Sequence, residues 1–409
     1  MWAQREKLAI THVTVIDCTG APAKPDMTVL IVGDRIADIG SSAIVAVPKN
    51  ARVLDGKGKF LIPGLWDMHG HLSDATQTAF PLLILNGVTG VRDMGGKLTE
   101  IDTWRSEIKA GTRIGPHIVR AGPFVDGPKQ GVPNRLTAIT PEEARSAVLQ
   151  LKHEGVDFIK VHNGLPRDAF FALMDEAHKQ HISVAIHLPK GIGAAEASDA
   201  GAASLEHVET LVEGQLWRPG ATAKDIDQAL AELEGTQGTA LFSTFVKNGT
   251  WFVPTLVAYE RGFVLWSNQP DALLPRLQVL RKGLEIVRKM HKAGVRMMAG
   301  TDFSDWALVP GIDLHNELAL LVEAGFSPME ALQAATRNPA EFLGNGDSFG
   351  TIEKGKIADL VMLDADPLED ISHTRKINTV VLGGKPFVIP TLQSEVLRQA
   401  ASKHGQRPQ

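Results

Sequence analysis

The chain has 409 residues, of which 44% are hydrophobic and 22% are charged, a composition typical of soluble globular proteins. Its formal net charge of −5 supplies no positive field for a nucleic-acid backbone, which excludes DNA or RNA as the expected partner. The single cysteine, Cys18, excludes an internal disulfide framework. No apolar run reaches 18 residues, so we expect no membrane span. Residues 1–6 are polar overall and the first apolar run is short, so we expect no secretory leader and a cytoplasmic protein.

Short strands and glycine turns fill the first 62 residues. In residues 29–39, for example, Gly33 and Asp34 predict a two-residue hairpin. The same pattern returns near the other end, in residues 350–390. Two separate β extensions would each expose sheet edges, so we expect residues 1–62 and 350–390 to combine in one small β-sandwich domain. Residues 391–409 would form a C-terminal tail.

Between these ends, residues 63–349 alternate between short apolar segments and amphipathic ones. The expected strands are residues 87–92, 118–122, 158–161, 184–186, 204–205, 251–255 and 296–299. The expected helices are residues 141–154, 166–180, 194–200, 277–293, 315–324 and 328–335. This alternation predicts an α/β fold, and the length favours a TIM-type (β/α)₈ barrel over an open sheet. No glycine-rich phosphate-binding motif follows a strand, so no nucleotide cofactor is indicated.

The strongest local signal is the segment PGLWDMHGH, which ends at His69 and His71. On a strand, residues i and i+2 face the same side, so both imidazoles can converge on one metal ion. A polar strand end without a metal is the plain alternative for such a pair.

Four further polar residues follow or interrupt apolar segments at the expected carboxyl ends of barrel strands. They are Lys160, His187, His207 and Asp302. Each alone has an ordinary explanation as a polar strand end, or as a salt-bridge partner in the case of the lysine. Together they indicate a site, because barrel enzymes build their active sites at this face. With the first two histidines they form a ligand set for two divalent metal ions.

The order HxH–Lys–His–His–Asp and the segments PGLWDMHGHL, AGTDF and GTIEKGKIADLVMLD resemble the amidohydrolase superfamily. The resemblance is to the branch of imidazolonepropionase-related enzymes that includes metal-dependent Xaa-Pro and Xaa-Arg dipeptidases. It covers nearly the whole chain. It implies a distorted (β/α)₈ barrel with a small β-sandwich built from both chain ends.

The resemblance also implies two divalent metal ions, with zinc as the first expectation. His69, His71 and Asp302 are expected on the more buried ion, and His187 and His207 on the more exposed one.

Lys160 is expected to bridge the ions after carboxylation by carbon dioxide. Burial beside cations disfavours its ammonium form and promotes the carbamate, which offers two oxygen ligands. The resemblance then implies hydrolysis of a C–N amide bond by a metal-bridging hydroxide, with Asp302 moving the proton. His162 shares the strand parity of Lys160, so it is expected to face the pocket as a further catalytic or substrate-binding residue.

The expected substrate is a small molecule such as a dipeptide, an N-acyl amino acid or a carbamate. An esterase, lactonase or organophosphate triester hydrolase on the same binuclear site is the alternative. A non-catalytic scaffold is disfavoured because it would not need Lys160 or Asp302. The sequence leaves open a homo-oligomer.

Expected substrate contacts lie at strand ends and in the loop after Asp302. Arg92 and Arg120 offer guanidinium groups for a carboxylate, with ion pairs at the barrel rim as the alternative. Trp306 and His315 follow in the loop, although His315 can equally open a helix. Residues 213–238 form an insertion that we expect to lie over the site as a lid or to pack on the surface.

Overall fold

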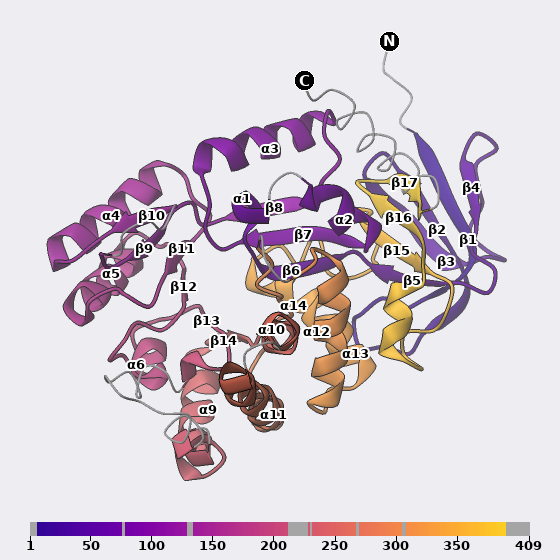
Figure 1. Cartoon of the computed structure of the whole chain (residues 1–409). Coiled ribbons are helices and arrows are strands. Elements are labelled where there is room, and N and C mark those ends of the chain that lie inside the picture. The colour runs from indigo at the N-terminus through magenta and orange to yellow at the C-terminus, as the bar shows by residue number, and fades with distance from the viewer. Residues whose placement is uncertain are drawn as a thin grey trace, which may run out of the picture.

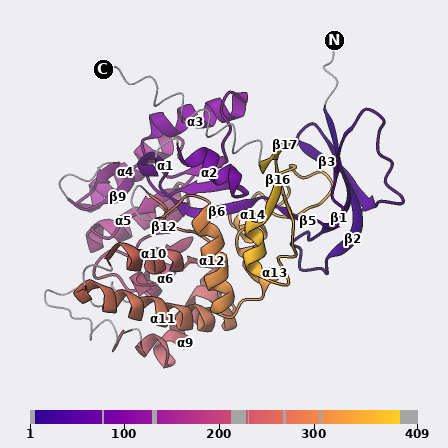
Figure 2. The same cartoon turned by 45° about the vertical axis from the view of Figure 1, so that its right-hand side comes forward.

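The computed structural model describes residues 6–389, apart from residues 76–77, 129–133, 212–227, 230, 267–269 and 305–307 and the side chains of residues 262–279. A small sheet stands beside a larger α/β part in both views (Figures 1 and 2). The expected C-terminal tail, Trp306 and most of the expected lid at residues 213–238 lie outside the described residues.

The small sheet combines strands from the two ends of the chain. Its order is β17-β16-β15-β5-β1-β2-β3, with β4 paired to β1. The early strands are β1 (Lys7–Val15), β2 (Lys24–Val32), β3 (Arg35–Ser41), β4 (Arg52–Asp55) and β5 (Phe60–Pro63). The late strands are β15 (Leu360–Leu363), β16 (Ile377–Leu382) and β17 (Lys385–Val388). Antiparallel pairing of β5 with β15 joins the two groups, so both chain ends contribute to one continuous sheet.

The larger part contains two parallel sheets. A three-stranded sheet consists of β6 (Leu65–Gly70), β7 (Val88–Asp93) and β8 (His117–Arg120). A six-stranded sheet has the order β10-β9-β11-β12-β13-β14. Its strands are β9 (Phe124–Asp126), β10 (Arg135–Thr137), β11 (Ile159–Val161), β12 (Val184–Ile186), β13 (Ser204–Glu206) and β14 (Trp251–Val253).

Backbone hydrogen bonds join the two parallel sheets at both sides. Asp157 N, just before β11, donates to Arg120 O at the end of β8 at 3.0 Å. On the other side, residues 297–303 form isolated bridges to Phe252 of β14 and to Gly70 of β6. The strand expected at residues 296–299 is therefore present only as bridging residues.

Helices cover the outside of the parallel strands (Figure 1). The first are α1 (Leu72–Ala75), α2 (Ala79–Leu85), α3 (Leu98–Ala110), α4 (Pro141–His153), α5 (Arg167–Lys179) and α6 (Ala194–Asp199). The later ones are α9 (Thr236–Asn248), α10 (Leu256–Trp266), α11 (Pro270–Lys292), α12 (Ile312–Glu323), α13 (Pro328–Ala334), α14 (Arg337–Phe342) and the 3₁₀ helix η1 (Ile371–Arg375). Their starts follow sequence chemistry: Thr140 and Ser327 each form a capping box just before a proline. Among the described residues, no helix is long and apolar enough to cross a membrane.

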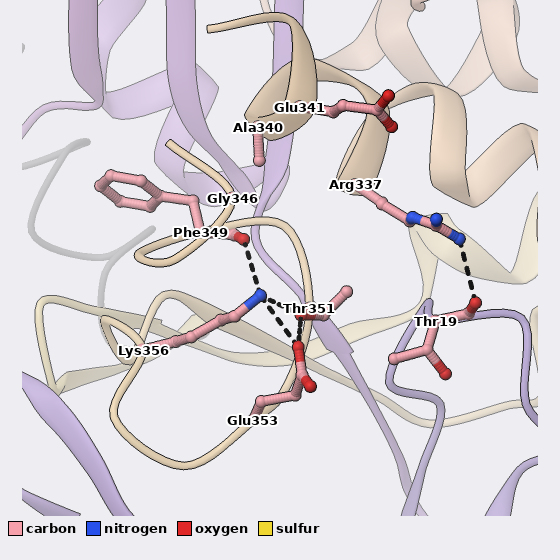
Figure 3. Close-up of a pocket in the computed structure, with 9 residues that line it drawn as sticks. All are labelled: Thr19, Arg337, Ala340, Glu341, Gly346, Phe349, Thr351, Glu353 and Lys356. Carbon is pink, nitrogen blue, oxygen red and sulfur yellow. Dashed lines mark hydrogen bonds and ion pairs between the residues drawn. The ribbon is translucent and has the colours of Figure 1, made fainter. Parts of the chain in front are cut away.

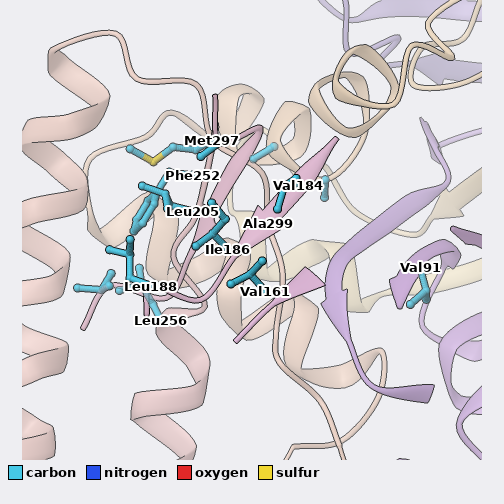
Figure 4. Packing of buried hydrophobic residues seen from close by; sticks show 14 of the residues in the cluster. Val91, Val161, Val184, Ile186, Leu188, Leu205, Phe252, Leu256, Met297 and Ala299 are labelled. Atoms are coloured by element: carbon cyan, nitrogen blue, oxygen red, sulfur yellow. The ribbon is translucent and has the colours of Figure 1, made fainter. Parts of the chain in front are cut away.

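The core lies between these helices and the parallel strands. Val161, Ile186 and Leu205 belong to the main cluster of buried apolar side chains, part of which is drawn in Figure 4. Because side chains alternate along a strand, the neighbouring Lys160 and Glu206 face the opposite side. The inner face of the strands therefore carries charged groups, and the outer face carries the hydrophobic core.

Gly70, at the end of β6, is a position where the fold requires the absence of a side chain. A Cβ atom there would lie 2.3 Å from Cε1 of the buried Phe303. Gly70→Ala is therefore expected to destabilise the protein by about 1–3 kcal/mol through overpacking, measured as a lower urea midpoint of unfolding. Gly346→Ala is the control, because its Cβ would meet no atom within 4 Å. Equal midpoints for the two variants would contradict this explanation.

The junction between the small sheet and the α/β part is polar. A cavity of about 360 Å³ lies there (Figure 3), and its charged groups are already paired. Lys356 donates to the carbonyl of Phe349 and pairs with Glu353, while Arg337 donates to the carbonyl of Thr19. The Arg337 contact ties α14 to the segment after β1, while the Lys356 contacts lie within the loop before β15.

His117 forms a second link at this junction. Its Nε2 lies 2.8 Å from Asp359 Oδ2, and its ring stacks on Trp66. Burial lowers the pKa of His117, but the bond and charge of Asp359 outweigh it and raise that pKa above 6.5. The pair therefore stabilises the fold fully below about pH 6.5 and loses this contribution as the pH rises through the folded-state pKa.

The expected result is that wild type loses stability relative to His117→Gln as the pH rises from 6 to 9. Urea unfolding of both proteins across this range measures the difference. A constant difference would show that the pair does not titrate in this way.

Candidate active site

His69 and His71 lie at the end of β6, and Asp302 lies next to both. Asp302 Oδ1 is 3.3 Å from His69 Nε2 and 3.2 Å from His71 Nε2. One ligand atom from each of the three residues lies within 4.8 Å of the others. Two imidazole nitrogens and a carboxylate oxygen suit a divalent transition metal, so this group can hold an ion.

A second group of imidazoles lies beside the first. The His207 ring centroid is 4.5 Å from that of His69 and 5.0 Å from that of His187. His187 follows β12 and His207 follows β13, which are neighbours in the parallel sheet. Burial holds the pKa values of both rings well below their usual range, which favours the neutral form that binds metal.

Lys160 of β11 projects into the same cavity and is 2% exposed. Within the described part of the chain, its buried Nζ has no hydrogen-bond partner. Burial is the main reason that the pKa of Lys160 falls to about 8. A buried amine without a hydrogen bond is costly, so its chemistry calls for a further group at this position.

The side chain of Asp302 is 34% exposed, so it can be reached from the cavity. Burial would raise its pKa, but the neighbouring imidazoles of His69, His207 and His71 lower it well below the usual range. The carboxylate is therefore ionised at neutral pH. Both metal binding and proton acceptance require that form.

Three residues of the site region have unusual backbone conformations. His207, Thr255 and Asp302 have φ values of 69°, 48° and 64°, in the left-handed region that favours glycine. His207 Nδ1 lies 2.9 Å from Thr255 Oγ1, so two of these residues also share a hydrogen bond. Such strain is maintained only where surrounding contacts enforce it, and it is common at functional sites.

Asp67 holds the two ligand-bearing segments together. Its buried carboxylate accepts hydrogen bonds from His69 N at 3.1 Å, Thr301 N at 3.0 Å and Thr301 Oγ1 at 2.7 Å. It thereby links β6 to the loop that carries Asp302. Burial raises its pKa to about 7.

His162 faces the cavity, with its ring centroid 4.7 Å from that of His187. Its Nδ1 lies 3.3 Å from Asp126 Oδ2, and the same carboxylate pairs with Arg135 at 2.9 Å. Asp126 Oδ1 also accepts the backbone N–H of Gly164 at 2.7 Å. This contact places the ring of His162 beside a buried carboxylate.

The cavity has a volume of about 340 Å³ and is lined by all six expected ligands and by His162. Other side chains that line it are Asp74, Met94, Phe124, Asn134, Arg135 and Glu209. Arg135 and Asp126 were not expected from the sequence. Their signal is weak because β9 and β10 have only three residues each, with Asp126 at the end of β9 and Arg135 at the start of β10.

Arg92 was expected to bind substrate, and the structure corrects this. Its side chain is fully buried beneath the site, where Nη2 contacts Glu206 at 2.8 and 2.9 Å. Glu206 in turn lies 2.8 Å from His69 Nδ1. The sequence signal for Glu206 was its strand parity, because it alternates with the outward-facing Leu205.

Two other expected substrate contacts lie away from the cavity. Arg120 is paired with Asp102 of α3, at 2.5 and 3.0 Å. The alternative of a rim ion pair is the correct one for this residue. His315 is buried in α12, where its ring contacts Thr374 Oγ1 at 2.9 Å and Asn86 O at 3.1 Å. It packs the helix against η1, and Trp306 lies outside the described residues.

The sequence profile of the amidohydrolase family matches residues 60–387. The ochratoxinase of Aspergillus niger is 26% identical over 436 residues, which cover 88% of this chain and 83% of that protein. The imidazolonepropionase of Alkaliphilus oremlandii strain OhILAs is 24% identical over 430 residues, with 93% of this chain and 96% of that protein covered.

A Xaa-Pro dipeptidase crystallised with methionine in its active site has a similar structure. Its TM-score is 0.77 at 23% identity, with 94% of this chain and 100% of that chain covered. This likeness shows a TIM-barrel-like α/β fold, which agrees with the two parallel sheets and their covering helices. The resemblance seen in the sequence is confirmed, and the family profile spans most of the chain. The chain therefore belongs to the amidohydrolase family and is a hydrolase of that family.

Proposed function

We propose that the protein is a binuclear metal-dependent hydrolase that cleaves a C–N amide bond of a small substrate. One observation carries the proposal: six side chains with ligand chemistry, drawn from different strands, line one cavity. They are His69, His71, Lys160, His187, His207 and Asp302. Membership of the amidohydrolase family supports the amide bond as the target.

Two ions would divide the ligands between them. His69, His71 and Asp302 would hold one ion, since their ligand atoms already lie within 4.8 Å of one another. His187 and His207 would hold the other, since their rings are neighbours and burial favours their neutral form. Nitrogen-rich sites with one carboxylate favour Zn²⁺, which is the ion we propose.

Lys160 would bridge the two ions as a carbamate. Its neutral amine attacks carbon dioxide, an N–C bond forms, and one proton leaves to solvent. The product would be an anion whose two oxygens could serve as metal ligands. The buried Nζ without a hydrogen-bond partner in the described residues supports this modification.

Bound ions of this kind supply an activated water and polarise the substrate carbonyl. The chain's own residues do the rest of the chemistry. Asp302, ionised and partly exposed, would accept the proton of the attacking water and pass it to the leaving nitrogen. His162, held by Asp126, would orient the substrate at the cavity wall.

The proposed architecture is a distorted (β/α)₈ barrel at residues 63–349 with a β-sandwich domain from residues 1–62 and 350–390. The backbone bonds that join the two parallel sheets support closure of the strands into one ring. The pairing of β5 with β15 supports a single domain built from both ends.

A substrate screen tests the function. Zinc-loaded protein would be assayed with dipeptides, N-acyl amino acids and carbamates, and with esters, lactones and phosphotriesters of matched side chains. We expect the amides and carbamates to be hydrolysed with higher kcat/KM. Turnover confined to esters or phosphotriesters would instead support the alternative activity on the same site.

A further inference from the structure

A fully buried ion pair lies behind His69. Glu206 Oε2 is 2.8 Å from His69 Nδ1, and both residues are 0–1% exposed. Arg92 Nη2 contacts both carboxylate oxygens of Glu206, at 2.8 and 2.9 Å. Ser204, two residues earlier on β13, accepts a hydrogen bond from Arg92 Nη1 and donates to Glu206 Oε1. No member of this group lines the cavity except His69.

The guanidinium group of Arg92 also contacts the backbone of β6 and two aromatic rings. Its Nε donates to Met68 O at 2.6 Å, which ties it to β6 one residue before His69. The rings of Phe158 and Phe342 lie 5.5 and 5.2 Å from its guanidinium carbon. A buried ion pair compensates for its desolvation only when its geometry is this complete, so the pair forms a rigid support.

We propose that Arg92 and Glu206 are positioning residues that fix the tautomer and the orientation of His69. Both oxygens of Glu206 accept from Arg92, which can only donate, so the 2.8 Å contact with His69 is assigned as one in which the ring donates from Nδ1. Nε2 then carries the lone pair and points at Asp302 Oδ1, where one ion would be held. Arg92 holds the carboxylate of Glu206 aimed at the ring. This inference takes only one thing from the proposed function, namely that His69 binds a metal ion.

Glu206→Gln tests the role with metal binding as the readout. The amide keeps the size of the side chain but can donate to His69 Nδ1 and so favour the wrong tautomer. We expect the Zn²⁺ affinity of the metal-free full chain to fall about 10–100-fold, the usual effect of losing such a partner. Competition with a chromophoric chelator, using Zn²⁺ alone, measures this.

Asp359→Asn is the matched control. It alters another His–carboxylate contact of 2.8 Å, between His117 and Asp359, that does not line the cavity. We expect this variant to bind Zn²⁺ as the wild type does. A folded Glu206→Gln protein, checked by circular dichroism, with wild-type Zn²⁺ affinity would overturn the inference. A wild type that binds no Zn²⁺ would contradict the proposed function instead.

The tautomer of His69 can also be measured directly, on metal-free protein in which Glu206 is unchanged. Selective ¹⁵N-histidine labelling of the metal-free wild type reports which ring nitrogen carries the proton, and His69→Gln assigns the signal. We expect the proton on Nδ1. A proton on Nε2 of His69 would overturn the inference whether or not Glu206→Gln folds.

Discussion

Asp302→Asn should lower the turnover of an amide substrate by about two orders of magnitude or more, the effect of removing a positioned acid–base group. The asparagine keeps the size of the side chain and one oxygen at the position beside His69 and His71, where Oδ1 now lies 3.2–3.3 Å from both imidazoles. It cannot accept the proton of the attacking water. The defect should therefore fall on kcat more than on KM.

Loss of metal would imitate this result, so zinc content must be measured on the same sample. Asp347→Asn, an exposed carboxylate in the loop after α14, is the control and should retain full turnover. If the Asp302→Asn protein keeps its zinc and turns over an amide at the wild-type rate, Asp302 does not move the proton. His162 would then be the next residue to test, because it faces the same cavity.

The second large effect is expected at Lys160. Lys160→Ala should reduce the bound zinc from two ions to about one or fewer and lower turnover at least about 100-fold, more than the loss of an outer partner costs. The physical reason is that alanine cannot form the proposed carbamate, whose oxygens would lie between the two groups of imidazoles. Elemental analysis and the rate on one amide measure the two consequences together.

A rescue experiment separates the bridge from a general loss of structure. Acetate or propionate supplies two carboxylate oxygens, so either should partly restore zinc and turnover to Lys160→Ala if the space left by the side chain admits it. Lys152→Ala, on the exposed face of α4, is the control and should need no rescue. Full zinc content in Lys160→Ala without any added acid would contradict the bridging role.

The parts of the site that could be predicted from sequence are those that follow from strand geometry. His69 and His71 share a face because their spacing is two, and both lie at the end of β6. Lys160, His187 and His207 could be placed at one rim because parallel strands end together. These arguments need only the strand positions, which short apolar segments reveal well.

Substrate contacts could not be predicted in this way, because a strand end does not determine which way a long side chain turns. Arg120 turns outward to Asp102 of α3, whereas Arg92 turns inward beneath the cavity to Glu206. His315 lies on a helix whose burial depends on η1, more than 50 residues later in the chain. Partners this distant in sequence leave no local pattern.

The same distinction between contacts of neighbouring residues and contacts of distant residues applies to the fold. Hairpins and helix caps such as Thr140 could be predicted because they depend on neighbouring residues. The strand expected at residues 296–299 forms only a single bridge, from Met297 to Phe252 of β14, and the bridge to β6 comes from Phe303 beyond the segment. Its place depends on bonds such as that between Asp67 and Thr301, which are 234 residues apart.

We propose that one cavity holds two ions bridged by Lys160. The most direct measurement is a titration of metal-free protein with Zn²⁺, with and without bicarbonate, followed by elemental analysis of the washed protein. We expect two zinc ions per chain, bound more tightly when bicarbonate is present. A stoichiometry of one or fewer, unaffected by bicarbonate, would contradict it.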